Sequence, residues 1–400
     1  MSVITQYLER YAEQEATFTV DFPEQFDSVL VLPCFDEPWA TCCSLLEHEF
    51  ENEVLLILVL NQPEDIDVCE NNQDLHDKLV SQFSKIWHSS NEQLALYKKN
   101  DNSVLLVDRF SDHHQISRKL GVGLARKVGA DIALSLIQQG HVRNQWIHNI
   151  DADIALPSTY STLVDTESTD TAALILPFEH FANERAALNQ AQVLYDRHMN
   201  YYVAALRWAG SPYAYHSLGS TIIINAQQYA QVRGFPKRSA GEDFHLLNKL
   251  RKVGDIKSLP APVIRIQTRL SHRTPFGTGA AISDISQLDN PESDYLFYHP
   301  QIFIELMVLL ALFPTLRNEQ QTTLRSIPSD TQQILETFNF SKAVRHAISH
   351  SDSEQGFLKH MHTWFDALKT LQFVHALRDR KYPSVTGKKL DQLLPDDLAI

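Results

Sequence analysis

Four short runs of Val, Ile and Leu, separated by helix-length segments, most constrain how this chain can fold. The runs lie at residues 28–33, 53–61, 103–108 and 146–151. Strands that are apolar almost throughout are typical of a sheet covered on both faces, and such sheets are mostly parallel. The pattern therefore predicts an α/β fold with a mixed, mostly parallel sheet. In such sheets ligands bind beyond the carboxyl ends of the strands.

Polar and acidic residues follow these predicted strands. Asp36 and Glu37 come after the first run, the second run ends in Asn61, and the fourth leads into Asp151 and Asp153. We expect these side chains to gather along one edge of the sheet, because parallel strands end at the same edge.

The composition excludes several classes of function. The 400 residues carry a formal charge of −14, which disfavours nucleic acid and anionic membrane surfaces as partners. The longest apolar run, 302–313, contains Glu305 and is too short for a transmembrane segment. No secretory signal is visible at the N-terminus, so the expected location is cytoplasmic. The four cysteines lack metal-ligand spacing, and we expect reduced thiols.

From about residue 290 the strand-like pattern gives way to helix-length segments. We expect an α/β domain over residues 1–285 and an α-helical C-terminal region over residues 286–400, large enough for its own small core. That region can pair subunits into a homo-oligomer, cap a substrate site or brace the first domain, and the sequence leaves these three roles open.

The stretch WIHNIDADIA places Asp151 and Asp153 on one side of an extended chain, with Ala152 turned aside. Two negative charges so close together repel each other, so a cation is expected between them. Mg²⁺ and Mn²⁺ prefer carboxylate oxygen and often share their shell with phosphate. A solvated turn at the end of a strand is the alternative.

No glycine-rich phosphate loop accompanies these carboxylates. GVG at residues 121–123 lies inside a predicted helix over residues 118–137, and neither G-x-G-x-x-G after a strand nor G-K-[ST] occurs. This argues against a dinucleotide-binding domain and against a nucleotidyltransferase. It favours a site that binds a nucleotide or a sugar through carboxylates, a metal and scattered basic residues.

Two further segments carry chemistry. Glu242 and Asp243 follow Gly241 in the first turn of a predicted helix, where a carboxylate is either a partner of the helix dipole or a general base. Arg269 and Arg273 lie in a second segment, and guanidinium groups suit a diphosphate or an acidic acceptor.

At this point the sequence resembles a known family. P-C-F-D-E-P after the first strand, A-R-K-x-G before the fourth, D-A-D at its end and G-E-D-F-H-L-L about 90 residues later are similar, in this order, to motifs of the family 2-like A-type glycosyltransferases. The resemblance covers roughly residues 28–280. It implies a Rossmann-like catalytic domain, a nucleotide-diphosphate sugar as the donor, and Mn²⁺ or Mg²⁺ bridging the diphosphate.

The resemblance also implies residue roles. Asp243 would be the catalytic base of an inverting transfer, and Glu242 would orient the acceptor or the base. His272 would join Asp151 and Asp153 as a third metal ligand. The implied donor-binding residues are Asp36, Glu37, Asn61, Arg126, Asp151, Gly219 and Arg273, with Asn61 in the place of an acid usual after the second strand.

The sequence thus predicts a metal-dependent hexosyltransferase-type glycosyltransferase acting on an unknown acceptor hydroxyl. A retaining transferase is the alternative within the same class, and there Asp243 would be structural or would contact the donor. A non-catalytic nucleotide-sugar-binding or scaffolding protein is the alternative from another class.

Overall fold

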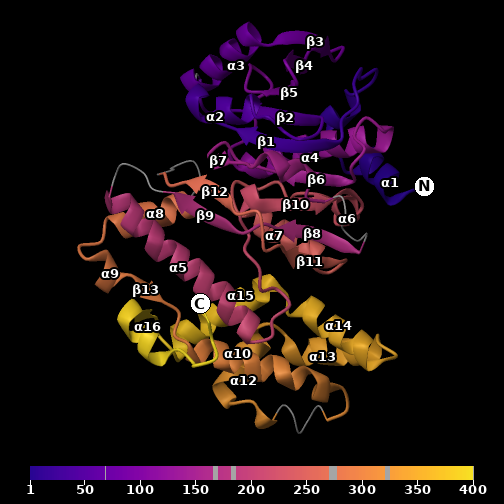
Figure 1. Ribbon diagram of the computed structural model, residues 1–400. Coiled ribbons are helices and arrows are strands. Elements are labelled where there is room, and N and C mark those ends of the chain that lie inside the picture. Colours follow the sequence, from indigo (N-terminus) through magenta and orange to yellow (C-terminus); the bar gives the residue numbers. More distant parts are fainter. Residues whose placement is uncertain (68, 165–169, 182–185, 270–276, 320–324, 400) are drawn as a thin grey trace. The chain divides into compact units, whose positions relative to one another are not determined.

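The computed structural model describes residues 1–67, 69–164, 170–181, 186–269, 277–319 and 325–399. Within these residues a nine-stranded sheet has the order β11-β8-β10-β6-β1-β2-β5-β4-β3, which can be followed down Figure 1 from β3 to β11. Its strands are β1 (Ser28–Cys34), β2 (Val54–Asn61), β3 (Ser84–His88), β4 (Leu94–Lys99), β5 (Asn102–Arg109), β6 (Trp146–Asn149), β8 (Thr171–Ile175), β10 (Ile222–Asn225) and β11 (Asp255–Ser258).

The sheet is mixed and mostly parallel, as predicted. β1 pairs in parallel with β2 and β6, and β2 pairs in parallel with β5, whereas β10 and β4 run against their neighbours. The four predicted runs are all strands, although β6 ends at Asn149, before the expected end at residue 151. The edge hairpin of β3 and β4 was not predicted. Its outer strand β3 is mostly exposed and therefore lacks a continuous apolar run.

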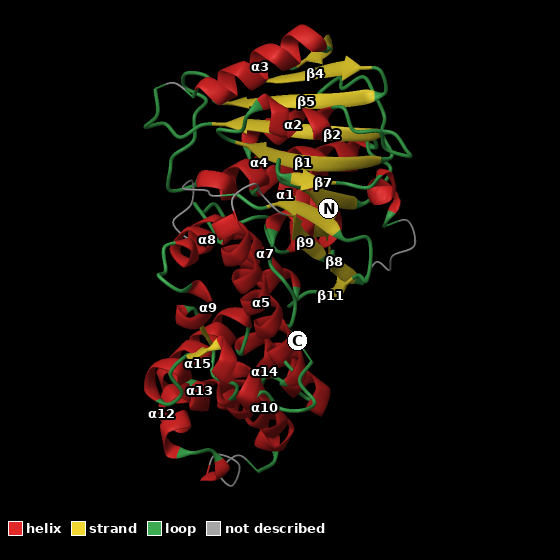
Figure 2. Cartoon of the chain, turned by 60° about the vertical axis from the view of Figure 1, so that its left-hand side comes forward, coloured by secondary structure: helices red, strands yellow, loops and turns green. Residues whose placement is uncertain are grey.

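Helices cover both faces of this sheet. Leu30 and Leu58 belong to a buried cluster with Leu45 of α2 and Leu75 of α3, whereas α4 packs on the opposite face, against β1 and β2. Figure 2 shows the strands side by side with helices packed along them. The helices of this part are α1 (Val3–Arg10), η1 (Gln14–Thr17), α2 (Trp39–Leu46), α3 (Glu70–Gln82), α4 (Gly121–Gln139), η2 (Ser158–Thr162), η3 (Gly219–Thr221), α6 (Ala226–Gln231) and α7 (Glu242–Leu250).

Helix α4 is buried from Gly123 to Ile137, including its charged residues. The Asp131 carboxylate accepts hydrogen bonds from Lys127 Nζ at 2.7 Å, from Tyr7 Oη at 2.6 Å and from Tyr229 Oη at 2.8 Å. Lys127 also donates to Tyr7 Oη and to the Tyr11 carbonyl. Buried charges need such partners, so this network fixes α1 and α6 against α4.

A second, three-stranded sheet has the order β7-β12-β9. Its strands are β7 (Ile154–Ala155), β9 (Phe178–Phe181) and β12 (Ile264–Gln267). β12 runs antiparallel to β7, and the Gln267 N–H extends this pairing by donating to the Asp153 carbonyl at 2.8 Å. This pairing places the residues that follow β12 beside Asp153, the second aspartate of the D-A-D stretch.

By contacts between residues, the chain divides into a unit of Met1–Asn183 with Ser217–Gly277 and a unit of Glu184–His216 with Thr278–Ile400. We call the second the helical unit. It contains α5 (Ala186–Trp208), α8 (Thr278–Ser286), α9 (Pro291–Asp294), α10 (Gln301–Leu312), η4 (Phe313–Arg317), α12 (Ser329–Thr337), α13 (Phe340–Ser349), α14 (Glu354–Trp364), α15 (Ala367–Arg380), α16 (Gly387–Leu393), β13 (Leu296–Phe297) and β14 (Val385–Thr386).

The predicted helical C-terminal region is confirmed, with one short antiparallel pairing of β13 and β14 added. The proposed boundary at residues 285 and 286 stays a prediction. Helix α5 precedes that boundary in sequence but groups with the helical unit by its contacts, chiefly those with α8.

The helical unit has its own core and polar links. Glu305 of α10 accepts hydrogen bonds from Thr331 Oγ1 of α12, from Lys381 Nζ and from Tyr382 Oη, each at 2.6 or 2.7 Å. No helix in the described residues is long and apolar enough to cross a bilayer.

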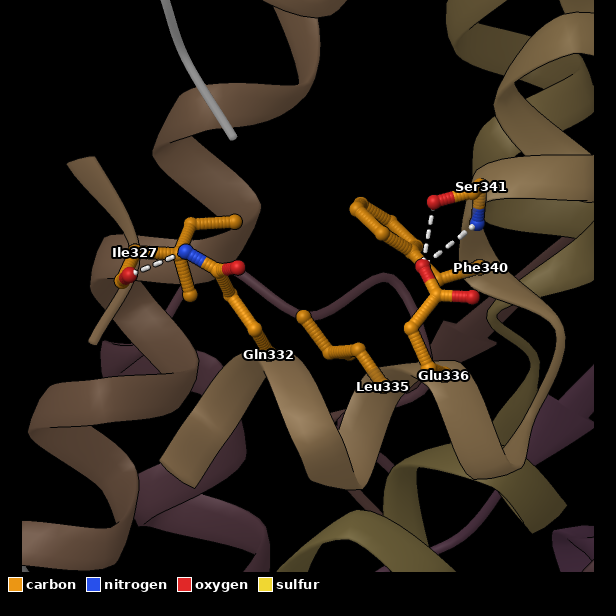
Figure 3. A pocket seen from close by; sticks show the side chains of 6 residues that line it. All are labelled: Ile327, Gln332, Leu335, Glu336, Phe340 and Ser341. Carbon is orange, nitrogen blue, oxygen red and sulfur yellow. Dashed lines mark hydrogen bonds between the residues drawn. The ribbon is translucent and has the colours of Figure 1, made fainter. Parts of the chain in front are cut away.

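Figure 3 shows a pocket in the helical unit between α12 and α13. It measures about 50 Å³ and is lined by Ile327, Gln332, Leu335, Glu336, Phe340 and Ser341. Ligand sites usually measure about 300 to 1,000 Å³, so this pocket holds a few water molecules at most.

Candidate active site at the strand ends

The candidate site lies in the first unit, where β1 and β6 end side by side. These strands pair in parallel, so the residues that follow them emerge at one edge of the sheet. Glu37 follows β1, while Asp151 and Asp153 follow β6. Helix α7 brings Glu242 and Asp243 through its first turn.

Arg126 of α4 joins two of these acidic segments. Its Nη2 donates to Asp151 Oδ1 at 2.6 Å and its Nε donates to Glu242 Oε1 at 2.9 Å. The Arg126 side chain is 4% exposed. Burial lowers the pKa of Arg126, but the charges of Asp151, Glu242 and Asp243 outweigh it and raise the pKa above its ordinary value. Arg126 is therefore a permanent positive charge between the D-A-D stretch and α7.

Gly219 makes room for this guanidinium. A Cβ atom at position 219 would collide with Nη2 and Cζ of Arg126. The remaining nitrogen, Nη1, is buried and has no hydrogen-bond partner among the described residues. Because a Cβ atom would collide with the guanidinium, only glycine at position 219 permits the position that Arg126 occupies.

Arg269 makes a second bridge, between Glu37 and Asp153. Its Nη1 and Nη2 donate to the two oxygens of Glu37 at 2.5 and 2.7 Å, and its Nε donates to Asp153 Oδ2 at 2.6 Å. Such bidentate pairs are among the strongest charge-assisted hydrogen bonds. The pairing of β12 with β7 is what brings Arg269 to Asp153.

The pKa of Asp153 is raised although Arg269 is its partner. Burial raises its pKa above the ordinary value, Arg269 opposes the rise, and the negative charges of Asp151 and Glu37 add to it. The two aspartates of the D-A-D stretch therefore act on one another, although each has its own arginine.

The pKa of Asp243 is raised as well. Burial raises the pKa of Asp243 to about 7, the charge of Glu242 adds to the rise, and the N–H of Phe244 and Arg126 oppose it. Its Oδ1 accepts that N–H at 2.6 Å. Gly241 ahead of it has a φ of 69°, a left-handed conformation that favours glycine and turns the chain into α7. A carboxyl group with this pKa exchanges protons readily near neutral pH.

Asp36 lies in a separate polar group. It has a φ of 54°, its N–H donates to Asn72 Oδ1 at 3.0 Å, and its Oδ1 accepts from Asn71 Nδ2 at 2.8 Å. Asn72 Nδ2 donates in turn to the Asn61 carbonyl at 2.9 Å. The ends of β1 and β2 are thus held together by the start of α3.

The structure brings together Glu37, Arg126, Asp151, Asp153, Gly219, Glu242 and Asp243 of the predicted site residues. Asp36 and Asn61 share the second polar group. His272 and Arg273 lie outside the described residues. Sequence reasoning missed the Glu37 to Arg269 pair and the roles of Asn71 and Asn72. The family motifs do not contain Asn71 or Asn72, and only the arginine spacing drew attention to Arg269.

The charge of the cluster bears on the expected cation. The described cluster holds five carboxyl groups and two guanidinium groups, so negative charge exceeds positive charge even when Asp243 is protonated. No group of three or more His, Cys, Asp or Glu side chains in the described ranges is placed to hold a metal ion alone. Mg²⁺ and Mn²⁺, however, commonly bind one or two carboxylates and complete their shell with water and phosphate.

The residues present fit such a cation. Asp151 and Asp153 each use one oxygen for an arginine and have a second oxygen without a hydrogen bond from the described residues. A diphosphate adds further negative charge, which this cluster would repel without a cation.

No protein-family model and no curated protein matches the sequence. Among solved structures, the chain is similar to S. aureus TarS 1–349 in complex with UDP-GlcNAc, with a TM-score of 0.39 and 13% identity, covering 85% of this chain and 91% of that one. It is also similar to the mannosyltransferase PcManGT from Pyrobaculum calidifontis in complex with GDP-Man and Mn²⁺, with a TM-score of 0.35 and 12% identity, covering 92% of this chain and 94% of that one. Neither protein is similar enough to assign a function to this chain.

Proposed function

We propose that the protein is a metal-dependent glycosyltransferase that moves a sugar from a nucleotide-diphosphate sugar to an acceptor hydroxyl with inversion. The observation that carries the proposal is the bridge made by Arg126, which hydrogen-bonds to Asp151 and to Glu242. It joins a carboxylate suited to a cation with the start of the helix that carries Asp243, the carboxyl group suited to proton transfer. Transfer of a glycosyl group needs both at one place.

Asp243 supports the proton-transfer part of this function. The acceptor hydroxyl must lose its proton as its oxygen attacks the anomeric carbon, and a carboxylate can take that proton. A general base works best when its pKa lies near the operating pH. Burial and Glu242 bring the pKa of Asp243 to about 7. Asp243 is therefore the proposed base, and Glu242 is held by Arg126 beside it.

Asp151 and Asp153 are the proposed ligands of Mn²⁺ or Mg²⁺. When bound, such a cation stabilises the negative charge that develops on the departing nucleoside diphosphate. Arg126 and Arg269 hold one oxygen of each carboxylate and so fix its direction. Both arginines also lower the repulsion between the carboxylates and the donor phosphates.

The donor residues proposed from the sequence divide by position. Asp36 and Asn61 belong to the polar group at the ends of β1 and β2, a place suited to the nucleoside. Gly219 is proposed to act through the space that it leaves for Arg126. His272 as a third metal ligand and Arg273 as a diphosphate ligand remain proposals on residues outside the described ranges.

A thermal-shift screen of nucleotide sugars, with and without Mn²⁺, tests the proposal. The panel includes UDP-GlcNAc and GDP-mannose as one uridine donor and one guanosine donor. A ligand at 100 times its dissociation constant stabilises by about 2.7 kcal/mol, which a thermal shift detects readily. We expect stabilisation that requires both the donor and the cation.

Substitutions test whether the thermal shift depends on the proposed metal ligands. Asp151→Asn and Asp153→Asn should lose the cation-dependent shift, whereas Asp101→Asn, at an exposed turn, should keep it. Donor binding that survives in both site variants contradicts the metal assignment. Binding without release of nucleoside diphosphate, for every acceptor tried, would favour a non-catalytic binding protein.

A further inference from the structure

Glu37 is a donor ligand by the family resemblance, but both of its carboxylate oxygens already have a partner in the folded chain. Oε1 accepts a hydrogen bond from Arg269 Nη2 at 2.7 Å, and Oε2 accepts one from Arg269 Nη1 at 2.5 Å. The Glu37 side chain is only 4% exposed. A carboxylate that is held and buried in this way is poorly placed to bind a ribose or a base. Its role is therefore to be sought through Arg269.

Arg269 is the arginine of the cluster that a ligand can reach. Its side chain is 26% exposed, whereas that of Arg126 is 4% exposed. A guanidinium has five N–H groups. Three of those on Arg269 donate to Glu37 and Asp153, so two have no partner among the described residues. Phosphate oxygens are well matched acceptors for such groups.

The contact with Glu37 fixes where these two N–H groups lie. An arginine side chain has several rotatable bonds and loses much conformational freedom when it is ordered on a ligand. Here the end nitrogens are held by Glu37, which follows β1, and Nε is held by Asp153, which follows β6. Because β1 and β6 pair in parallel, both anchors belong to one edge of the sheet. The guanidinium is therefore ordered before any ligand arrives.

Glu37 also limits the contact between Arg269 and Asp153. Without Glu37, the end nitrogens could turn towards Asp153 and pair with both of its oxygens, as guanidinium groups often do with carboxylates. In the structure only Nε donates to Asp153, at Oδ2. Its Oδ1 is thus left for the cation of the proposed reaction, while Arg269 stays beside it.

We propose that Glu37 is a positioning residue, which holds Arg269 so that the guanidinium binds the diphosphate of the donor. Glu37 itself does not touch the donor, in place of the direct contact that the family resemblance implies. The inference rests on the proposed function, because it requires a ligand that carries a diphosphate.

The sign of one substitution separates positioning from an effect of charge alone. Glu37→Gln removes a negative charge and keeps the size of the side chain. If Glu37 acted only through its charge, the substitution would reduce the repulsion of a diphosphate and tighten its binding. If Glu37 positions Arg269, loss of the bidentate pair releases the guanidinium, and binding should weaken.

The test is a calorimetric titration of the full chain with inorganic pyrophosphate at saturating Mg²⁺, so that differences in metal affinity between variants do not enter. Pyrophosphate has no nucleoside and no sugar, so its affinity reports only contacts with a diphosphate. The variants are Glu37→Gln, Arg269→Ala and the double variant. Arg265 and Glu179, an exposed ion pair in the three-stranded sheet with 3.3 Å between Nε and Oε1, supply the matched controls Arg265→Ala and Glu179→Gln.

Circular dichroism of each ligand-free variant shows whether it is folded. Arg269→Ala leaves the buried Glu37 carboxylate without this partner and is the variant most at risk of unfolding. Glu37→Gln decides the question by its sign alone, so the proposal is tested even if Arg269→Ala does not fold.

We expect Arg269→Ala to weaken pyrophosphate binding at least about tenfold, the usual loss for a hydrogen bond to a charged group. Glu37→Gln should weaken it about three- to tenfold, the range expected when one ordered side chain is released. In the Arg269→Ala background, Glu37→Gln should cause no further loss. Both control variants should bind pyrophosphate as the wild-type chain does.

Unchanged or tighter binding by Glu37→Gln would overturn the proposal, and so would an equal loss in the Arg269→Ala background. In both of these cases the wild-type chain still binds pyrophosphate with Mg²⁺, so the proposed function stands. A wild-type chain that binds neither pyrophosphate nor any nucleotide sugar of the panel would contradict both.

Discussion

Asp243→Asn should make the protein more stable and less active. The folded chain holds this carboxyl group where its ionised form is disfavoured, so its pKa rises from 3.8 to about 7. Each pH unit corresponds to 1.36 kcal/mol, so ionised Asp243 costs the folded state roughly 4 kcal/mol above pH 7. Asparagine has no charge to bury. We expect the variant to be more stable than wild type by about 2 to 4 kcal/mol at pH 8, since the new amide loses part of the gain.

The sign of the pH dependence follows from the raised pKa. Between pH 3.8 and 7 the folded chain holds a proton on Asp243 that the unfolded chain has released, so the wild type loses stability as the pH rises through this window. Asp243→Asn removes that contribution. The difference between variant and wild type should therefore be small at pH 4 and full at pH 8.

Urea denaturation at pH 4, 6 and 8 measures this difference, and Asp101→Asn serves as the exposed control. In parallel, release of nucleoside diphosphate from the donor identified in the screen should fall by roughly 10² to 10⁴ in Asp243→Asn, the range that a general base supplies. A variant no more stable at pH 8 than at pH 4, relative to wild type, would refute the reasoning about burial. A more stable variant with full turnover would leave that reasoning intact and assign the base elsewhere.

Other substitutions test the remaining contacts. Arg126→Met should cost about 3 to 5 kcal/mol of unfolding free energy in denaturant melts, because it leaves the buried carboxylate of Glu242 unpaired. Gly219→Ala should cost about 1 to 3 kcal/mol in wild type and almost nothing in the Arg126→Met background, a non-additivity that a double-mutant cycle detects. Arg269→Ala should bind Mn²⁺ more tightly in a calorimetric titration, because it removes a positive charge that repels the metal ion beside Asp153; unchanged affinity would mean that the metal does not use this carboxylate. Burial lowers the pKa of His148 to about 3, so the unfolded chain alone takes up a proton as the pH falls below 6.5, and His148→Phe should escape about 2 kcal/mol of the destabilisation between pH 7 and pH 5.

The strands could be predicted because their signal is local. Val, Ile and Leu in unbroken runs mark strands buried on both faces, and all four predicted runs are strands of the main sheet. The exposed strand β3 lacks that signal, and β4 pairs with it at the edge of the sheet. The end of β6 was placed too late because Ile150 continues the apolar run although the pairing stops at Asn149.

The carboxylates of the site could be predicted, but their partners could not. Asp151, Asp153, Glu242 and Asp243 stand out through spacing and family motifs. The partner of Glu37 lies 232 residues away, and no local pattern connects Glu37 with Arg269. The positive charge expected beside the aspartates is partly supplied by the protein itself, through two arginines that only the folded chain brings there.

The buried network on α4 holds Arg126 in place, although no residue of the network contacts Asp151 or Glu242. Lys127, which pairs with Asp131 and Tyr7, directly follows Arg126 in the helix. A helix held by several buried hydrogen bonds cannot slide or rotate by one residue without breaking all of them. The first eleven residues of the chain, through Tyr7 and the Tyr11 carbonyl, therefore keep the guanidinium of Arg126 in register with Asp151 and Glu242. Loss of the Tyr7 hydroxyl should therefore displace the guanidinium of Arg126, although Tyr7 does not contact the site.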